Sequence, residues 1–201
     1  MNFENDEVFI IEIRFSEPLI KINNMNKILV FEYLVYRLDK WKKDIEKTGK
    51  IVPSFTKLRL QKILFLVCAW NTSDTDMRLL NTFNNFYALP YGPVEMDIYE
   101  AMKKSNSFQY IKFQRNECVY DKLDESMFND IQANERRWVD EAVEEFETNQ
   151  RKYLTMPVFD LVNITHRWSA WKIMMDIATF LGNKKEEMSV ECICNSSIKA
   201  F

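Results

Sequence analysis

The fold is decided by the stretch Lys57-Leu58-Arg59-Leu60-Gln61-Lys62-Ile63-Leu64-Phe65-Leu66-Val67-Cys68-Ala69-Trp70. Its pattern predicts a helix, and apolar side chains fall on every side of that helix rather than on one stripe. A helix without a polar face is normally surrounded by other elements. Thr56 precedes the stretch and can accept a hydrogen bond from an unpaired amide of the first turn. We therefore predict a central helix after Thr56, with Ile63–Trp70 in the core.

A second stretch, Ala88-Leu89-Pro90-Tyr91-Gly92-Pro93-Val94-Glu95, follows an extended aromatic segment. Proline suits the first turn of a helix, where its missing N–H costs no hydrogen bond, and it keeps the preceding residue out of the helical region. The pattern therefore predicts a helix that starts at Pro93 and places Val94, Ile98 and Met102 on one face.

The rest of the chain favours more helices and a little β structure. Periodicity predicts helices over residues 26–48, 126–153, 158–164, 170–181 and 190–195. Alternation predicts a strand at 7–15 and a hairpin with strands at 108–113 and 117–120, which the first strand can join. The predicted fold class is mainly α (α+β), with a small antiparallel β-hairpin or three-stranded sheet. We expect one domain, 1–201, made of an N-terminal β arm (1–25), a core (26–182) and a C-terminal helix and tail (183–201).

Composition narrows the function classes. A hydrophobic content of 47% with 28% charged residues is typical of a globular protein, and a net charge of −3 gives no general affinity for nucleic acid. The N-terminus lacks the pattern of a signal peptide. The longest apolar run, Ile63–Trp70, is far shorter than the ~20 residues of a membrane-spanning helix. We therefore expect a cytoplasmic protein with reduced cysteines and no membrane partner.

The residues that usually carry chemistry are sparse. His166 is the single histidine, and no glycine-flanked serine accompanies it. Cys192 and Cys194 are separated by one residue and lack a second cysteine pair, which is a poor zinc motif. Three glycines leave no phosphate-binding loop. The sequence therefore predicts no catalytic residue, metal or cofactor, and we interpret His166 as a structural residue that ties its loop to a neighbouring group.

Residues 37–62 form a basic sector, with nine lysines or arginines against three acidic residues. One interpretation is two solvated helix faces. A second is a docking surface for an acidic partner, which would use Lys43, Lys57, Arg59 and Lys62. A third is nucleic-acid binding, although the sequence has no helix-turn-helix pattern.

The Tyr91-Gly92-Pro93-Val94 stretch also has two compatible interpretations. As a fold device, Gly92 permits a close backbone approach and Pro93 begins a helix, while Tyr91 packs down. As a recognition surface, Tyr91 would join Trp70 and Lys62 in an aromatic and basic patch of the composition common in binding hot spots.

Several segments, in this order, resemble one known family. They are Leu60-Gln61-Lys62-Ile63-Leu64-Phe65, Tyr91-Gly92-Pro93-Val94, Ile98-Tyr99-Glu100-Ala101, Leu161-Val162-Asn163-Ile164-Thr165-His166 and Ala170-Trp171-Lys172. The set is similar to the SocA-like (Panacea) antitoxin domain, a family that includes phage-associated GepA-type proteins, over roughly residues 26–181.

The resemblance implies an antitoxin that neutralises a cognate toxin by direct binding, with a protease or chaperone as a further partner, because at least one family member delivers its toxin to a protease. It gives motif roles to Leu60, Gln61, Tyr91, Gly92, Pro93, Val94, His166 and Trp171. The alternative is a nucleic-acid-binding or phage-associated regulatory domain, which only the basic sector supports. A hydrolase built around His166 is a further alternative.

Overall fold

The computed structural model describes residues 17–196, with side chains from Met25 onward, and within this range it contains eight α-helices, two 3-10 helices and five strands. The α-helices are α1 (Glu17–Lys47), α2 (Lys57–Ala69), α3 (Met96–Ala101), α4 (Ala133–Asn149), α5 (Lys152–Thr155), α6 (Val158–Thr165), α7 (Ser169–Phe180) and α8 (Val190–Cys194). The strands are β1 (Phe86–Leu89), β2 (Gly92–Glu95), β3 (Lys112–Gln114), β4 (Glu117–Val119) and β5 (Glu186–Met188). The 3-10 helices are η1 (Arg78–Asn81) and η2 (Glu125–Phe128).

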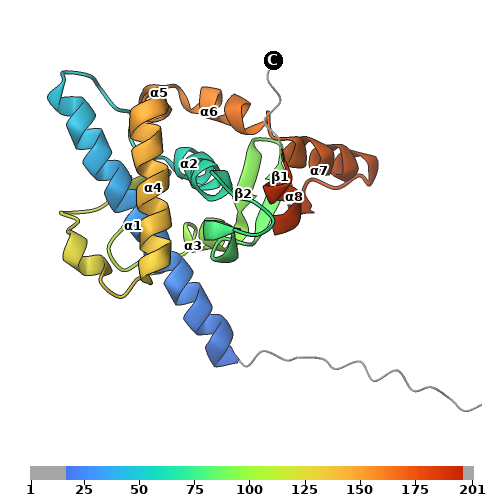
Figure 1. The fold of residues 1–201 in the computed structure, drawn as a ribbon, viewed down its shortest axis with the longest axis horizontal. Coiled ribbons are helices and arrows are strands. Elements are labelled where there is room, and N and C mark those ends of the chain that lie inside the picture. The colour runs from blue at the N-terminus through green and yellow to red at the C-terminus, as the bar shows by residue number, and fades with distance from the viewer. Residues whose placement is uncertain (1–16, 197–201) are drawn as a thin grey trace, which may run out of the picture.

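Helix α2 lies at the centre of the molecule, as predicted (Figure 1). Every residue from Arg59 to Cys68 is buried. The helix contacts α1 and α4 as well as β2 and α6. Thr56 is its N-cap, and the Thr56 hydroxyl accepts a hydrogen bond from the Arg59 amide at 3.2 Å. The central position of the Ile63–Trp70 segment is therefore confirmed, although Trp70 itself is only half-buried.

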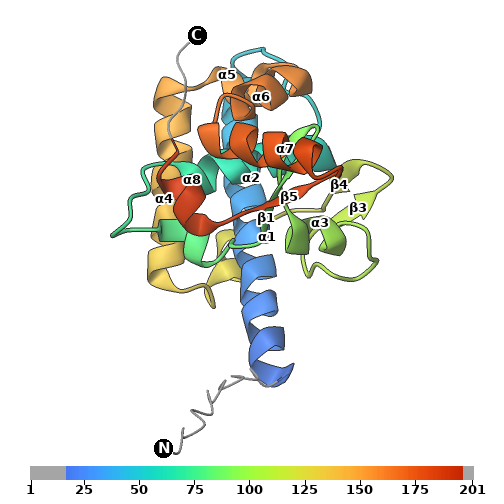
Figure 2. The same ribbon diagram turned by 90° about the vertical axis from the view of Figure 1, so that its right-hand side faces the viewer.

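Two small antiparallel sheets accompany the helices. The first has the strand order β2-β1-β5, with Phe86 paired to both Glu95 and Met188. Its third strand, β5, comes from the C-terminal segment and runs beside β1 under α7 (Figure 2). The second sheet is the β3–β4 hairpin, in which Phe113 faces Cys118. The predicted fold class is thus confirmed, but the three-stranded sheet consists of β1, β2 and β5, and the hairpin stands apart from it.

The predicted helix start at Pro93 is wrong, because residues Gly92–Glu95 form strand β2. Pro93 pairs with Ala88 across the β1–β2 hairpin, at an edge of the sheet where a missing N–H is tolerated. Helix α3 begins only at Met96. Glu95 is its N-cap, and the Glu95 carboxylate accepts a hydrogen bond from the Ile98 amide at 2.8 Å.

Three other predicted elements also differ from the structure, and one is the strand predicted at 108–113, because β3 spans only Lys112–Gln114. Helix α1 begins at Glu17 rather than near residue 26, and Pro18 fits its first turn, so the predicted N-terminal β arm is helical from Glu17 onward. The predicted strand at 7–15 lies outside the described residues. The predicted helix 126–153 is divided into η2, α4 and α5, and at the first break Phe128 is fully buried against Tyr33, Tyr36 and Tyr110. Strand β5 was not predicted.

Other local signals are confirmed. Gly49 and Gly182 follow helices with φ angles of +81° and +72°, which suit glycine. Ser189 caps α8 by accepting a hydrogen bond from the Cys192 amide.

Among the described residues, no helix is both long enough and apolar enough to cross a membrane.

Candidate functional site

Two side chains of α2 cover the outer edge of β2. The Gln61 Oε1 atom accepts a hydrogen bond from the Glu95 amide at 2.9 Å, and Gln61 Nε2 donates to the Glu95 carbonyl oxygen at 3.2 Å. The amide side chain thereby replaces a neighbouring strand, since it offers one donor and one acceptor to the same residue. Lys62 Nζ donates to the Pro93 carbonyl oxygen at 2.5 Å. The central helix therefore fixes the position of β2.

Lys62 is completely buried and forms no ion pair with a described residue. Burial disfavours its charged form and lowers the pKa of Lys62 to about 7. Its ammonium group lies against Gly92, where a Cβ atom would be 3.0 Å from Lys62 Nζ and 2.6 Å from Thr165 Oγ1. Gly92 also has a φ angle of +91°, so both the space and the backbone conformation require glycine. The close approach predicted for Gly92 is therefore present.

His166 and Trp171 close the opposite side of this region. Their rings stack with a centroid distance of 3.7 Å and an interplanar angle of 7°, and Trp171 Nε1 donates to the Leu89 carbonyl oxygen at 3.0 Å. Trp171 therefore connects α7 to the end of β1. His166 Nε2 is buried and has no hydrogen-bond partner among the described residues, so a tie through this nitrogen is not formed, and the contact seen for the ring is its stacking on Trp171. Burial, and then the nearby Lys62, lower the pKa of His166, which favours the neutral ring.

The other two motif residues are also in the interior. Leu60 is completely buried in the core, and Val94 is buried in β2. Gln61, Lys62, Thr165 and Trp171 lie against the β1–β2 hairpin at Glu95, Pro93, Gly92 and Leu89, and His166 stacks on Trp171. The segments that resembled a family in sequence therefore meet in space at this hairpin. We call this group of contacts the hairpin clamp.

The hairpin clamp presents Tyr91 at the surface. Tyr91 lies in the turn between β1 and β2 and is 62% exposed, contrary to the prediction that it packs down. Its ring contacts that of Phe159 on α6, with centroids 6.4 Å apart, and Phe159 is 59% exposed. Helix α6 contacts β2, so the aromatic pair is fixed to the clamp.

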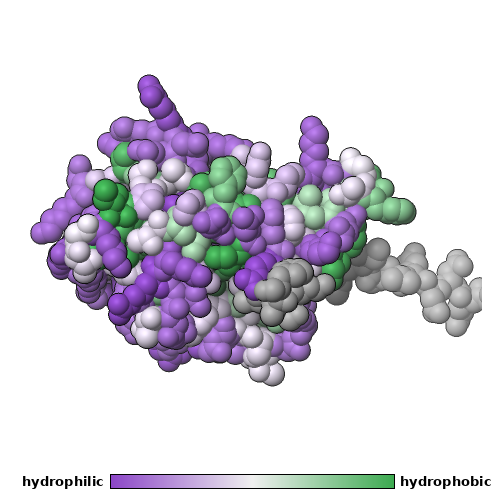
Figure 3. Space-filling model, turned by 90° about the horizontal axis from the view of Figure 1, so that it is seen from above, coloured by the Kyte–Doolittle hydropathy of each residue, from purple (hydrophilic) through white to green (hydrophobic). Residues whose placement is uncertain are grey.

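Helix α7 adds more exposed apolar side chains beside this pair. Ile173, Ile177, Phe180 and Leu181 are exposed, and their spacing of four, three and one places them on one side of the helix. Figure 2 shows α6 and α7 on the same side of the molecule, and Figure 3 shows apolar surface at the end where α7 lies. We call Tyr91, Phe159, Ile173, Ile177, Phe180 and Leu181 the apolar surface. Large exposed apolar groups that gather on neighbouring elements are typical of interaction sites.

The predicted basic surface is wrong for two of its four residues. Arg59 is buried and donates to the carbonyl oxygens of Tyr153, Leu154 and Met156, at 3.3, 3.3 and 2.7 Å. Lys62 is buried in the hairpin clamp. Both lie on α2, where packing on all sides leaves no solvated face, so they stabilise the fold instead of meeting solvent.

The other two residues of the predicted basic surface, Lys43 and Lys57, differ in exposure and in the groups that they contact. Lys43 is exposed and pairs with Asp39 at 2.6 Å. Lys57 is half-buried, with its Nζ atom 5.7 Å from the centroid of the Phe113 ring. The predicted patch of Tyr91, Trp70 and Lys62 is not formed either. Trp70 packs against the Arg78 guanidinium, 5.1 Å from the ring centroid, while Tyr91 packs against Phe159.

Sequence reasoning missed most of the apolar surface. Phe159, Ile173, Ile177, Phe180 and Leu181 were assigned to helices but not to a site. A signal for them exists in α7, because Ser169–Phe180 contains more large apolar residues than one buried face requires. Among the described residues, no three His, Cys, Asp or Glu side chains are close enough to hold a metal ion.

The fold and the site define a mainly helical protein in which buried polar contacts hold a β-hairpin and display an apolar surface beside it. The model of the family Antitoxin SocA-like, Panacea domain, matches residues 60–172, which is more than half of the 201 residues. The chain therefore belongs to this family. The matched region begins in α2, ends in α7 and contains the whole hairpin clamp. No curated protein and no solved structure matches the chain.

Proposed function

We propose that this protein is an antitoxin that neutralises a cognate toxin by binding it directly through the apolar surface. Family membership supports the antitoxin role. The observation that carries the choice of surface is the exposure of six large apolar side chains on α6, α7 and the β1–β2 turn. Burial of the exposed part of these side chains removes apolar surface from water, at roughly 25 cal/mol per Å², and therefore favours toxin binding.

The rigid support of this surface strengthens the proposal. Tyr91 and Phe159 are held by elements that the hairpin clamp fixes, and Trp171 connects α7 to β1. Because these side chains are positioned before the toxin arrives, less conformational entropy is lost on binding. Exposed aromatic side chains are also the residues that most often dominate binding energy.

A co-expression experiment tests the proposal. The product of the neighbouring gene is used as the candidate toxin, and growth of the host reports neutralisation. We expect the double variant Phe159→Asp and Phe180→Asp to fold normally, because both side chains are more than half exposed, and to lose protection and toxin binding. Ile51→Asp is the matched control, since Ile51 is 88% exposed on the loop between α1 and α2.

The proposal is overturned if the double variant melts like the wild type and still protects the cells. It also fails if the neighbouring gene product is harmless in the absence of this protein. Delivery of the bound toxin to a protease is a separate hypothesis that the family resemblance implies. A toxin half-life that is unchanged by this protein would contradict it.

A further inference from the structure

A groove of about 670 Å³ lies on another part of the molecule, between the loop 103–109 after α3 and the β3–β4 hairpin. Its size is within the range of pockets that bind small ligands or short peptide segments. Helix α3 and the hairpin lie side by side in Figure 2, away from the apolar surface of α6 and α7. None of the six residues of the apolar surface lines this groove.

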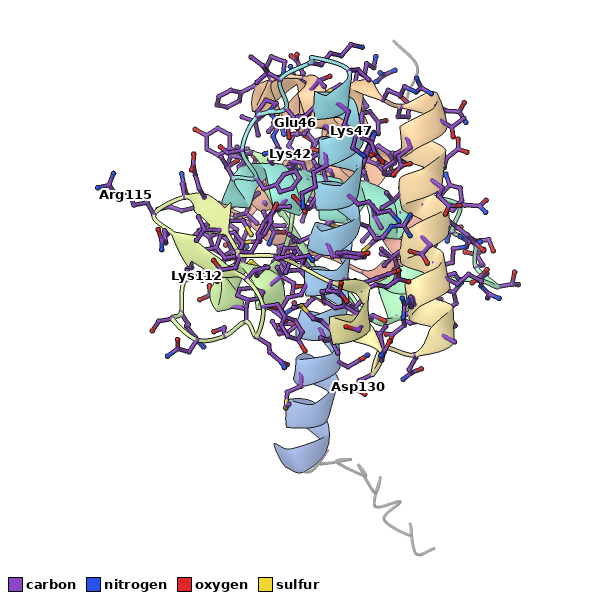
Figure 4. The ribbon with its side chains drawn as sticks, turned by 90° about the vertical axis from the view of Figure 1, so that its left-hand side faces the viewer. Lys42, Glu46, Lys47, Lys112, Arg115 and Asp130 are labelled. Carbon is purple, nitrogen blue, oxygen red and sulfur yellow. The ribbon has the colours of Figure 1, made fainter. Side chains whose placement is uncertain are left out.

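The charged side chains of the groove are mostly positive. Five cations and one carboxylate, Asp121, line it, and the cations are Lys57, Lys103, Lys104, Lys112 and Arg115. Lys103 is paired with Glu100 at 2.7 Å. Lys104, Lys112 and Arg115 are exposed and form no ion pair with a described residue. Figure 4 shows Lys112 and Arg115 on the hairpin, with Arg115 pointing out into solvent. The groove therefore attracts negative charge.

One wall of the groove is the open edge of a strand. Strand β4 is covered on its outer side, where the Cys118 amide donates to the Phe55 carbonyl oxygen at 2.8 Å. Strand β3 pairs only with β4. Phe113 faces Cys118, and the two residues of such an antiparallel pair turn their amide and carbonyl groups in opposite directions. The Phe113 N–H and C=O therefore point away from β4, and no described residue forms a hydrogen bond with them.

Contacts with helix α1 fix the position of the groove. A buried carboxylate on α1, Glu32, accepts hydrogen bonds through Oε1 from the amides of Tyr110 and Ile111, at 2.6 and 3.0 Å. Phe108 packs against Phe31 of α1 and against Phe113 of β3. The residues that lead into β3 are thus attached to the longest helix, so the open edge is a fixed feature.

We infer that this groove binds an extended, acidic segment of a partner protein, which adds to β3 as a further strand. The open edge supplies a backbone donor and an acceptor, which an extended peptide matches. The free cations select acidic side chains, and Lys112 on the edge opposes pairing with a second copy of the same edge. A single-stranded nucleic acid fits less well, because base stacking requires an exposed ring, whereas the aromatic residues that line the groove are all half-buried and in contact with other side chains: Phe108, Tyr110, Phe113 and Tyr120.

A labelled peptide tests this inference without any toxin. The probe is a fluorescein-labelled seven-residue peptide of alternating glutamate and valine, added to the full-length protein at low salt. We expect saturable binding that weakens as salt is added. The same peptide with lysine in place of glutamate should not bind. Replacement of the central valine by proline should weaken binding by about fivefold or more, because an amide donor to the edge is lost.

Two triple variants locate the site. Lys104→Glu, Lys112→Glu and Arg115→Glu together should reduce peptide affinity at least about tenfold. The matched control is Lys40→Glu, Lys50→Glu and Lys184→Glu, which changes the net charge equally at exposed lysines outside the groove and should leave the affinity within about twofold. In the unmodified protein, amide NMR signals of Lys112 and Phe113 should shift on peptide addition, which requires no variant to fold.

Several results would overturn the inference. One is an equal loss of affinity in both triple variants, since net charge alone would then explain binding. Another is binding of the peptide without any change at Lys112 and Phe113. Tighter binding of an eight-nucleotide oligothymidine, lost in the groove variant only, would assign the groove to single-stranded nucleic acid. Because the assay contains no toxin, its failure leaves the antitoxin proposal unaffected, and a failed co-expression test leaves the groove unaffected.

Discussion

At the residue scale, Lys62 is buried although its neighbours in the sequence suggest a solvated basic residue. It lies among basic residues in the chain, yet in the fold it is buried with one carbonyl partner, the Pro93 oxygen. An ammonium group without a carboxylate partner is costly to bury, and the cost falls when the group loses its proton. The pKa of about 7 in the folded protein compares with 10.5 for an ordinary lysine.

This difference in pKa predicts a pH dependence of stability. Below about pH 7, Lys62 is protonated in both states and the full cost of its burial remains; between about pH 7 and 10.5, only the unfolded state keeps the proton. The free energy of unfolding should therefore rise with pH across this range, relative to that of Lys62→Met. Urea unfolding of both proteins at several pH values measures the difference. A difference that is independent of pH would contradict the prediction.

At the element scale, α2 combines a strong N-cap with complete burial. Its polar residues Arg59, Gln61 and Lys62 are as buried as its leucines, and each reaches the backbone of another element. The helix therefore organises α5, β2 and the β1–β2 turn as well as the apolar core. A carboxylate at one of its buried apolar positions would have neither water nor a hydrogen-bond donor as a partner.

Leu64→Asp tests the central position of α2. Leu64 is completely buried, so the carboxylate would have no water and no partner, and a domain with a total stability of about 5–15 kcal/mol should not survive this change. We expect aggregated protein or protein without a cooperative thermal transition. The control Ile51→Asp, at an exposed position, should change the free energy of unfolding by less than about 0.5 kcal/mol. A cooperatively melting Leu64→Asp protein would show that the central placement is wrong.

At the scale of the whole molecule, one buried ion pair connects distant parts of the chain. Lys27 on α1 pairs with Glu95 at 2.8 Å and with Asp97 at 2.5 Å, at the junction of β2 and α3. Burial lowers the pKa of Lys27, but Glu95 and Asp97 more than offset this effect and leave it raised. Burial raises the pKa of Glu95, and Lys27 opposes that change. Each charge is therefore tolerated because the other is present.

A double-mutant cycle tests this connection. Lys27→Met should cost about 3–5 kcal/mol of stability, because it leaves the Glu95 carboxylate buried without its partner. Adding Glu95→Gln to Lys27→Met should recover part of the loss, since the amide carries no charge and can still accept a hydrogen bond from the Ile98 amide. Chemical denaturation of the four proteins gives the coupling energy. Costs that simply add would show that the two charges do not interact.

Local patterns predicted much of this protein. The apolar sequence of α2 and its Thr56 cap, the β3–β4 hairpin and the glycines after helices all follow from interactions within a few residues, which the sequence contains directly. The motif residues of the hairpin clamp were also identified in sequence, although their contacts were not. The start of α1 was missed although Pro18 is compatible with a first helical turn, and the break at Phe128 was missed because the burial of its ring depends on residues distant in the chain.

By itself, the sequence determined the fold class, the buried central helix and the family resemblance, because periodicity and ordered motifs are properties of the chain. Tertiary structure alone decided which polar and apolar side chains meet solvent. Arg59 and Lys62 became interior residues because α2 is covered on all sides, while Tyr91 and the α7 side chains remained outside because no described element packs over them. The sequence shows where the basic residues lie along the chain. Only the tertiary structure separates the buried cations Arg59 and Lys62 from the exposed cations of the groove.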